Sequence, residues 1–182
     1  MTASPDRAMI DAFKELVSHQ FEAALCTLSI CIDKCPDAAW NAPVANYKFC
    51  QVAFHTVFYA DYYLGTNDPT FREQPFHREH ADFFRDYEEF IDRPPVLLYD
   101  RPTMQKYVEH CRQKAAQSLP AETPESLAAP CGFPRKSFSR AELHVYSIRH
   151  IQHHAAQLSL RLRLDHKIDI PWVRTGWDDR KY

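Results

Sequence analysis

The chain has 182 residues, a formal net charge of -2 and aromatic side chains at 13% of its positions, which favours one globular domain over residues 1–182 with a packed interior. Basic and acidic residues are interspersed, so nothing favours electrostatic binding of nucleic acid, and no apolar run approaches the roughly 20 residues that span a bilayer. The N-terminal residues do not resemble a signal peptide and the six cysteines form no C-x-x-C pair, so we expect a cytoplasmic chain with reduced thiols.

The scarcity of glycine and the lack of an alternating strand pattern predict an all-α chain. Long helices are predicted over about 4–35, 47–64, 103–118 and 139–165, with a short helical turn over 37–40. Ser4 is expected to be the N-cap of the first helix, and Ser139 with Glu142 to form a capping box at the start of the last.

Four long helices predict a four-helix bundle whose binding sites lie between facing helices. Two connections, from Gly65 to Arg101 and from Leu119 to Phe138, are too long for simple hairpins. They predict a bundle with long crossover connections, and a short helix is expected over 80–90 within the first of them.

Three histidines lie within five residues of the last predicted helix. His150 and His154 are four residues apart and project from one helix face, a spacing that lets two imidazoles bind one divalent ion. No Glu directly follows His150, so the metalloprotease signature is absent. His153 projects to the other side of His150 and is expected to support or pack against the site rather than to bind the ion.

A third ligand is offered by His55, near the middle of the second predicted helix. It shares an apolar and aromatic face with Val52, Tyr59 and Tyr62 and should therefore point inward. Such a histidine is either a core residue hydrogen-bonded to Tyr or Gln, or a metal ligand. The three histidines together favour the metal site, in which three neutral imidazoles leave a fourth position open for water or substrate.

Four further residues are candidates for substrate contact or for support of the ligands: Tyr59, His153, Gln157 and Arg161. No carboxylate is placed as a general base, because Glu142 belongs to the capping box and Asp61 is expected at the flank of its helix. The sequence therefore predicts a metal site more firmly than a reaction.

The remaining histidines carry weaker expectations. His77 and His80 lie in the long connection, where they could close over the site as a lid. The others, which have no spacing relation to the predicted site, are expected at the surface: His19, His110, His144 and His166.

A histidine in the middle of the second helix, followed near the C-terminus by H-x-x-x-H within His-Ile-Gln-His-His-Ala-Ala-Gln-Leu, resembles the DinB/YfiT-like superfamily of metal-dependent enzymes. The resemblance implies a four-helix bundle in which His55, His150 and His154 bind a divalent transition metal, zinc or nickel in the first place. Ala156 stands where the family often has Gly, and the connection from Gly65 to Arg101 is longer than is typical.

Two classes of function follow from this resemblance. In the first, the protein is a metal-dependent S-transferase, isomerase or hydrolase that acts on a small molecule, with a low-molecular-weight thiol as cofactor. In the second, it is a stress-associated homodimer that binds metal without catalysis. A third alternative is a helical bundle without metal, in which the histidines only pack and form hydrogen bonds.

Overall fold

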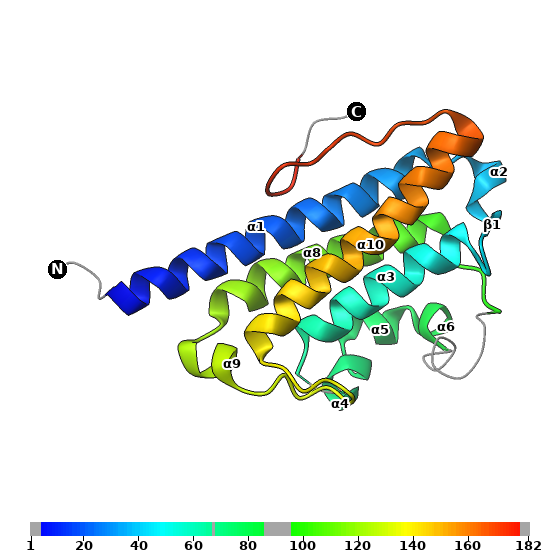
Figure 1. The fold of residues 1–182 in the computed structure, drawn as a ribbon. Coiled ribbons are helices and arrows are strands. Elements are labelled where there is room, and N and C mark those ends of the chain that lie inside the picture. Colours follow the sequence, from blue (N-terminus) through cyan, green and yellow to red (C-terminus); the bar gives the residue numbers. More distant parts are fainter. Residues whose placement is uncertain (1–4, 67, 86–95, 179–182) are drawn as a thin grey trace.

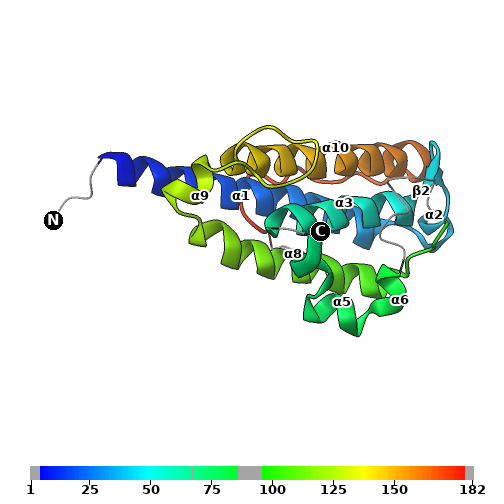
Figure 2. The same cartoon turned by 90° about the horizontal axis from the view of Figure 1, so that it is seen from below.

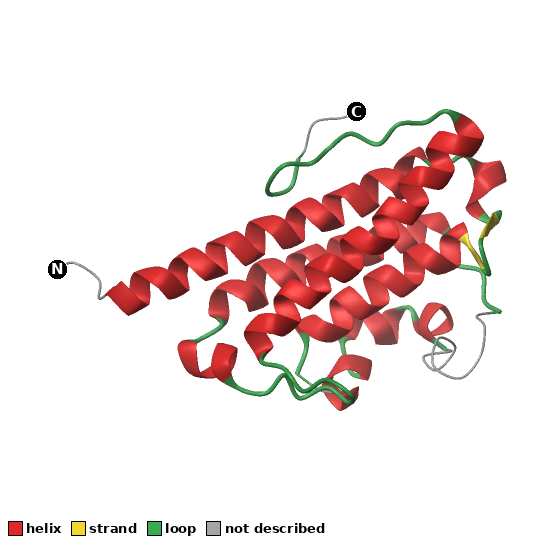
Figure 3. Ribbon diagram, in the orientation of Figure 1, coloured by secondary structure: helices red, strands yellow, loops and turns green. Residues whose placement is uncertain are grey.

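The computed structural model describes residues 5–66, 68–85 and 96–178, and over these residues the chain is mostly helical (Figure 1, Figure 3). The predicted all-α class is therefore confirmed. Two predicted features lie outside the described residues: the N-cap at Ser4, and residues 86–90 of the expected short helix.

The bundle is formed by four long helices among the described residues: α1 (Pro5–Lys34), α3 (Phe49–Leu64), α8 (Arg101–Ala121) and α10 (Arg140–His166). Each helix contacts two others, in the order α1, α10, α3, α8 and back to α1, and Figure 2 shows α10 and α8 along opposite sides. The interior is filled by large apolar side chains such as Phe21, Phe54, Met104 and Ile151. None of the described helices is both long and apolar enough to span a membrane.

Local caps set the ends of these helices. Asp100 is the N-cap of α8 and accepts a hydrogen bond from the Thr103 N–H at 2.8 Å, so the helix begins at Arg101. Pro102 is tolerated in the first turn because an N–H there would have no partner within the helix. Helix α8 also includes Pro120 next to its last residue, so it is longer at both ends than predicted. Ser139 accepts the N–H of Glu142 at 3.2 Å, as expected for the N-cap of α10.

A small antiparallel hairpin precedes α3, where the sequence predicted the start of the helix. The strands β1 (Pro43–Val44) and β2 (Tyr47–Lys48) pair Val44 with Tyr47, and α3 begins only at Phe49. Ala45 makes the tight turn possible by adopting a left-handed backbone with φ of 54°. The predicted start at Tyr47 was wrong because strands of two residues leave no periodic pattern in the sequence.

The long connections fold into short helices that extend the bundle. Between α3 and α8 lie α4 (Asp68–Arg72), α5 (Pro75–Glu79) and α6 (Ala81–Phe84), while α2 (Asp37–Trp40) and α9 (Pro124–Ala128) occupy the other connections. Phe76 stacks on Tyr107 of α8 with ring centroids 5.5 Å apart, and Phe84 meets the same ring edge-on at 4.8 Å. Aromatic packing thus holds residues 75–84 of the first long connection to the bundle.

The chain after α10 runs back along α1 (Figure 1). The N–H of Gly176 donates to the carbonyl of His19 at 3.0 Å, and Val173 is buried against Ala23 and Ile30. This segment covers the side of α1 that faces away from α3 and leaves the contact between α3 and α10 uncovered (Figure 1).

Candidate metal centre

Helices α3 and α10 bring the three predicted histidines together. His55 comes from α3, and His150 and His154 come from successive turns of α10, as the four-residue spacing predicted. One ring nitrogen of each lies within 4.8 Å of the others, and the ring centroids are 4.7 to 5.2 Å apart. A single ion between the rings could contact all three after small side-chain rotations, because zinc–imidazole bonds are about 2.0 to 2.1 Å long.

The surroundings keep these imidazoles neutral. Burial, together with neighbouring His154, lowers the pKa of His55 to about 3. Burial and the other histidines lower the pKa of His150 to about 2, and burial also lowers the pKa of His154. Neutral imidazole is the form that binds metal, so each ring retains a lone pair for a ligand at neutral pH.

One nitrogen of the cluster distinguishes a metal site from ordinary core packing. Nε2 of His150 is buried, and no hydrogen-bond partner lies near it among the described residues. A buried polar atom without a partner costs about 1–3 kcal/mol, so core histidines are normally hydrogen-bonded. A core histidine with both ring nitrogens satisfied therefore does not describe His150, whose ring also interacts with the backbone of His55, whereas a divalent cation fits the free Nε2.

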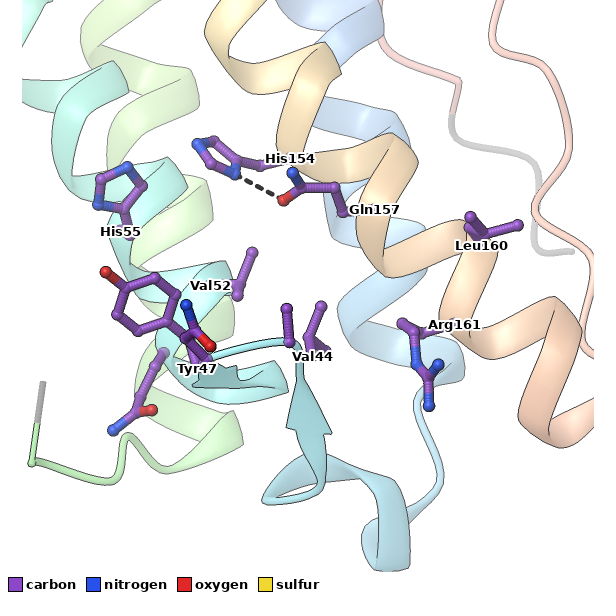
Figure 4. Close-up of a pocket in the computed structure, with 11 residues that line it drawn as sticks. Val44, Tyr47, Val52, His55, His154, Gln157, Leu160 and Arg161 are labelled. Atoms are coloured by element: carbon purple, nitrogen blue, oxygen red, sulfur yellow. Dashed lines mark hydrogen bonds between the residues drawn. The ribbon is translucent and has the colours of Figure 1, made fainter. Parts of the chain in front are cut away.

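Gln157 fixes the ring of His154. The Gln157 carbonyl can only accept, so Nδ1–H of His154 donates to it at 3.0 Å, and the lone pair stays on Nε2 (Figure 4). The Gln157 amide in turn donates to Nε2 of His153 at 3.0 Å. His153 thus supports the site through Gln157 and lies outside the cluster of three, as predicted from its helix face.

A cavity of about 550 Å³ opens beside His55 and His154 (Figure 4). The β-hairpin, α3 and α10 form its walls. Its apolar lining includes Val44, Val52 and Leu160, while Gln157 and Arg161 also border it. A volume of this size is typical of small-molecule sites.

Tyr59, a candidate for substrate contact or for support of the ligands, lies against the ligand rings. Tyr59 does not border this cavity and packs edge-on against the rings of His55 and His150, with centroids 4.8 and 5.7 Å away. Burial raises its pKa, which keeps the phenol neutral. Arg149 borders a separate depression of about 490 Å³ together with His150 and His153.

A second polar cluster, centred on Asp61, was not predicted. Asp61 is fully buried, not at the helix flank, and accepts hydrogen bonds from Nε2 of His77 and from the Tyr107 hydroxyl, both at 2.9 Å. Lys114 lies 2.5 Å from the same carboxylate, and His110 is 3.9 Å away. Burial would raise the pKa of Asp61, but His77 and Lys114 outweigh it and lower the pKa.

This arrangement corrects several expectations. His77 is buried on Asp61 and is not a lid over the metal site, and His110 is half-buried beside it. Asp61, His77 and His110 could reach one ion, but the Lys114 ammonium already neutralises the carboxylate, which disfavours a cation there. The cluster instead joins α5 to α3 and α8. A signal was present, because Asp61 lies seven residues after buried Phe54 and hence on the same inward stripe.

The expectation that His144 lies at the surface was also wrong. It is buried rather than exposed, and its Nε2 lies 2.9 Å from Oε1 of Glu122. Arg140 donates to the same oxygen at 2.8 Å, so the pair of basic side chains joins α10 to the end of α8. This network includes none of the three clustered histidines and connects the two helices.

The fold and the cluster together define a helical-bundle protein with three histidines that could hold one metal ion. The family model of the DinB superfamily matches residues 20–158, which include His55, His150 and His154, so the chain belongs to the DinB superfamily. The suspected relationship is thereby confirmed. No curated protein and no solved structure matches the chain.

Proposed function

We propose that this protein is a metal-dependent enzyme in which His55, His150 and His154 hold one divalent transition metal, zinc or nickel in the first place. The observation that carries the proposal is the buried Nε2 of His150, which has no hydrogen-bond partner among the described residues and lies in a cluster of neutral imidazoles. Three protein ligands leave a coordination position open, as in catalytic zinc sites.

The cavity beside His55 and His154 is where a small-molecule substrate would reach that position. When bound, the metal would act as a Lewis acid and would favour the ionised form of a thiol or of water. The protein supplies largely apolar cavity walls and a His154 ring held in one tautomer by Gln157.

The lining of this cavity favours a thiol over water as the reacting group. None of the described residues that border it carries a carboxylate, and hydrolysis usually depends on a general base near the water. A thiol has an ordinary pKa of about 8.5 and needs less help to ionise. We therefore place an S-transferase or isomerase with a low-molecular-weight thiol before a hydrolase; cytoplasmic location and homodimer formation remain predictions from the sequence.

The test is metal content by plasma mass spectrometry, on protein purified without a histidine tag or nickel resin. About one transition metal per chain is expected in the wild type, and His55→Ala or His154→Ala should lose it, since two imidazoles hold an ion weakly. His19→Ala is the matched control, because His19 is an exposed histidine outside the cluster. Failure to take up zinc, nickel or cobalt on reconstitution would overturn the proposal and leave a bundle whose histidines only pack.

The thiol preference has its own readout. Cobalt-substituted protein titrated with cysteine, N-acetylcysteine and mercaptoethanol should develop a sulfur-to-cobalt charge-transfer band. A metal-loaded protein whose spectrum no thiol changes would contradict the thiol assignment and favour the non-catalytic alternative.

A further inference from the structure

The wall of the cavity carries a cation at some distance from the histidines. Arg161 is seven residues after His154 on α10, which places both on the same face about 10 Å apart along the helix. Both border the same cavity (Figure 4). Apart from histidine, Arg161 is the one basic residue among the described residues that line it.

The guanidinium of Arg161 is only partly satisfied. Its Nη2 lies 2.5 Å from Oδ2 of Asp165, one turn further along α10. Its Nε is buried, and within the described part of the chain it has no hydrogen-bond partner. A guanidinium has five N–H donors in a planar fork that suits a carboxylate. Because Nε is buried, the donors left for an anionic ligand are those on the terminal nitrogens that Asp165 does not use, on a side chain that is 43% exposed.

The surface between Arg161 and the histidines is largely apolar. Val44, Val52 and Leu160 contribute aliphatic side chains. The side-chain carbonyl of Gln51 accepts a hydrogen bond from the N–H of Lys48 at 2.8 Å, and its Nε2 donates to the carbonyl of Leu97 at 3.0 Å. With these polar atoms occupied, Gln51 presents mainly its methylene groups to the cavity. A ligand that spans this distance therefore needs an apolar middle.

We propose that the cavity binds amphipathic monocarboxylates, with the carboxylate on Arg161 and the apolar body extending along Val44 and Val52 to the histidines. This inference names the substrate class of the proposed enzyme and rests on that proposal only for the end of the ligand nearest the metal. The rise of about 10 Å along α10 between the two positions is close to the length of an extended eight-carbon chain, so octanoate is a suitable probe. Arg161 lies outside residues 20–158, the segment that matches the family.

Calorimetric titration of metal-free protein with octanoate tests the carboxylate end. Octanoate should bind, and octanamide should bind at least tenfold more weakly because it lacks the charge. Arg161→Gln should weaken octanoate binding about tenfold to a hundredfold, while Arg161→Lys should retain part of it as a point charge.

Two variants separate ligand binding from a merely structural ion pair. Asp165→Asn should tighten octanoate binding severalfold, because it removes the carboxylate that competes for Arg161. Arg163→Gln is the matched control: Arg163 is an exposed arginine on α10 that pairs with Asp169 and does not border the cavity. If octanoate affinity is the same in Arg161→Gln, Asp165→Asn and wild type, the inference is wrong.

The metal end is tested separately, with 8-mercaptooctanoate and the cobalt-loaded protein. The charge-transfer band should appear at about tenfold lower ligand concentration in wild type than in Arg161→Gln, with the same final intensity. Octanoate binding without metal uptake would uphold the carboxylate site and overturn the proposed enzyme. Metal uptake without octanoate binding would overturn the carboxylate site and leave the proposed metal centre standing.

Discussion

At the scale of single residues, Gln157 is the support on which the metal affinity of His154 should depend. Gln157→Leu removes the acceptor for Nδ1–H of His154 and frees the ring to rotate, so metal affinity should fall about tenfold to a hundredfold. Competition for the metal with a chromophoric chelator measures this affinity. Gln157→Glu still offers an acceptor and should retain most of the affinity; equal affinity in the Leu variant would exclude this role.

The three histidines could be predicted from the sequence because helix geometry alone fixes which residues share a face. A spacing of four on α10 and an inward position on α3 were enough to place His150, His154 and His55 together. The Asp61 cluster could not be predicted in the same way, because its partners come from α5 and α8, and no local spacing connects residues from separate elements. For a related reason the sequence left open whether Tyr59 contacts substrate or supports the ligands: a helix face does not reveal which side of a histidine a neighbouring ring covers.

A second prediction for a single residue concerns Glu122, whose contribution to the stability of the fold should depend on pH. Burial would raise its pKa, but hydrogen bonds from His144, Ser126 and Arg140 outweigh burial and lower the pKa to about 2. The folded pKa lies below the unfolded value near 4.5, so the carboxylate stabilises the fold above that value and loses its contribution as the pH falls toward 2.

The contribution of the Glu122 carboxylate to the free energy of unfolding should fall by on the order of 2 kcal/mol between neutral pH and pH 2. Urea unfolding of wild type and Glu122→Gln across this range measures it. The variant should be less stable than the wild type at pH 7, and the difference in their free energies of unfolding should become smaller below pH 4.5. A difference that does not change with pH would show that the charge of Glu122 does not contribute to stability.

At the scale of elements, Arg140 of α10 caps the C-terminal end of α3. Its guanidinium donates to the carbonyls of Tyr63, Leu64 and Gly65 at 2.9, 3.1 and 2.7 Å. These carbonyls have no partner within the helix, so the arginine satisfies groups that a helix end leaves open. The cap also ties α3 to α10, the two helices that carry the histidines.

Arg140→Leu should therefore destabilise the protein by about 2–4 kcal/mol, because it leaves three carbonyls and Glu122 without this donor. Urea unfolding at neutral pH is the measurement. Arg163→Gln, in the exposed last turns of the same helix, should change stability by less than about 0.5 kcal/mol. A similar loss in both variants would mean that the cap has no special role.

The elements themselves were predictable where they were long and periodic. Helix α10 was predicted to within about a residue at each end because Ser139 is an unambiguous N-cap. The hairpin before α3 was missed, since its turn depends on Ala45 in a left-handed conformation that alanine rarely adopts. That hairpin forms one wall of the cavity, so the sequence revealed the histidines better than the shape of the site beside them.

At the scale of the whole molecule, the proposed metal would link α3 to α10 and should stabilise the folded chain. His55 lies about 100 positions before His150 and His154 in the sequence, so the preformed site does not exist in the unfolded state. Metal at 100 times its Kd should add about 2.7 kcal/mol to the free energy of unfolding, which raises Tm by about 5 to 10 °C for a chain of this size.

Differential scanning calorimetry of metal-free protein, with and without added zinc, measures this shift, and a chelator should reverse it. The His55→Ala variant should show almost no shift, since the link to α3 is lost, whereas His19→Ala should respond like the wild type. If zinc raises Tm equally in wild type and His55→Ala, the ion binds elsewhere, and the two helices are held by packing alone.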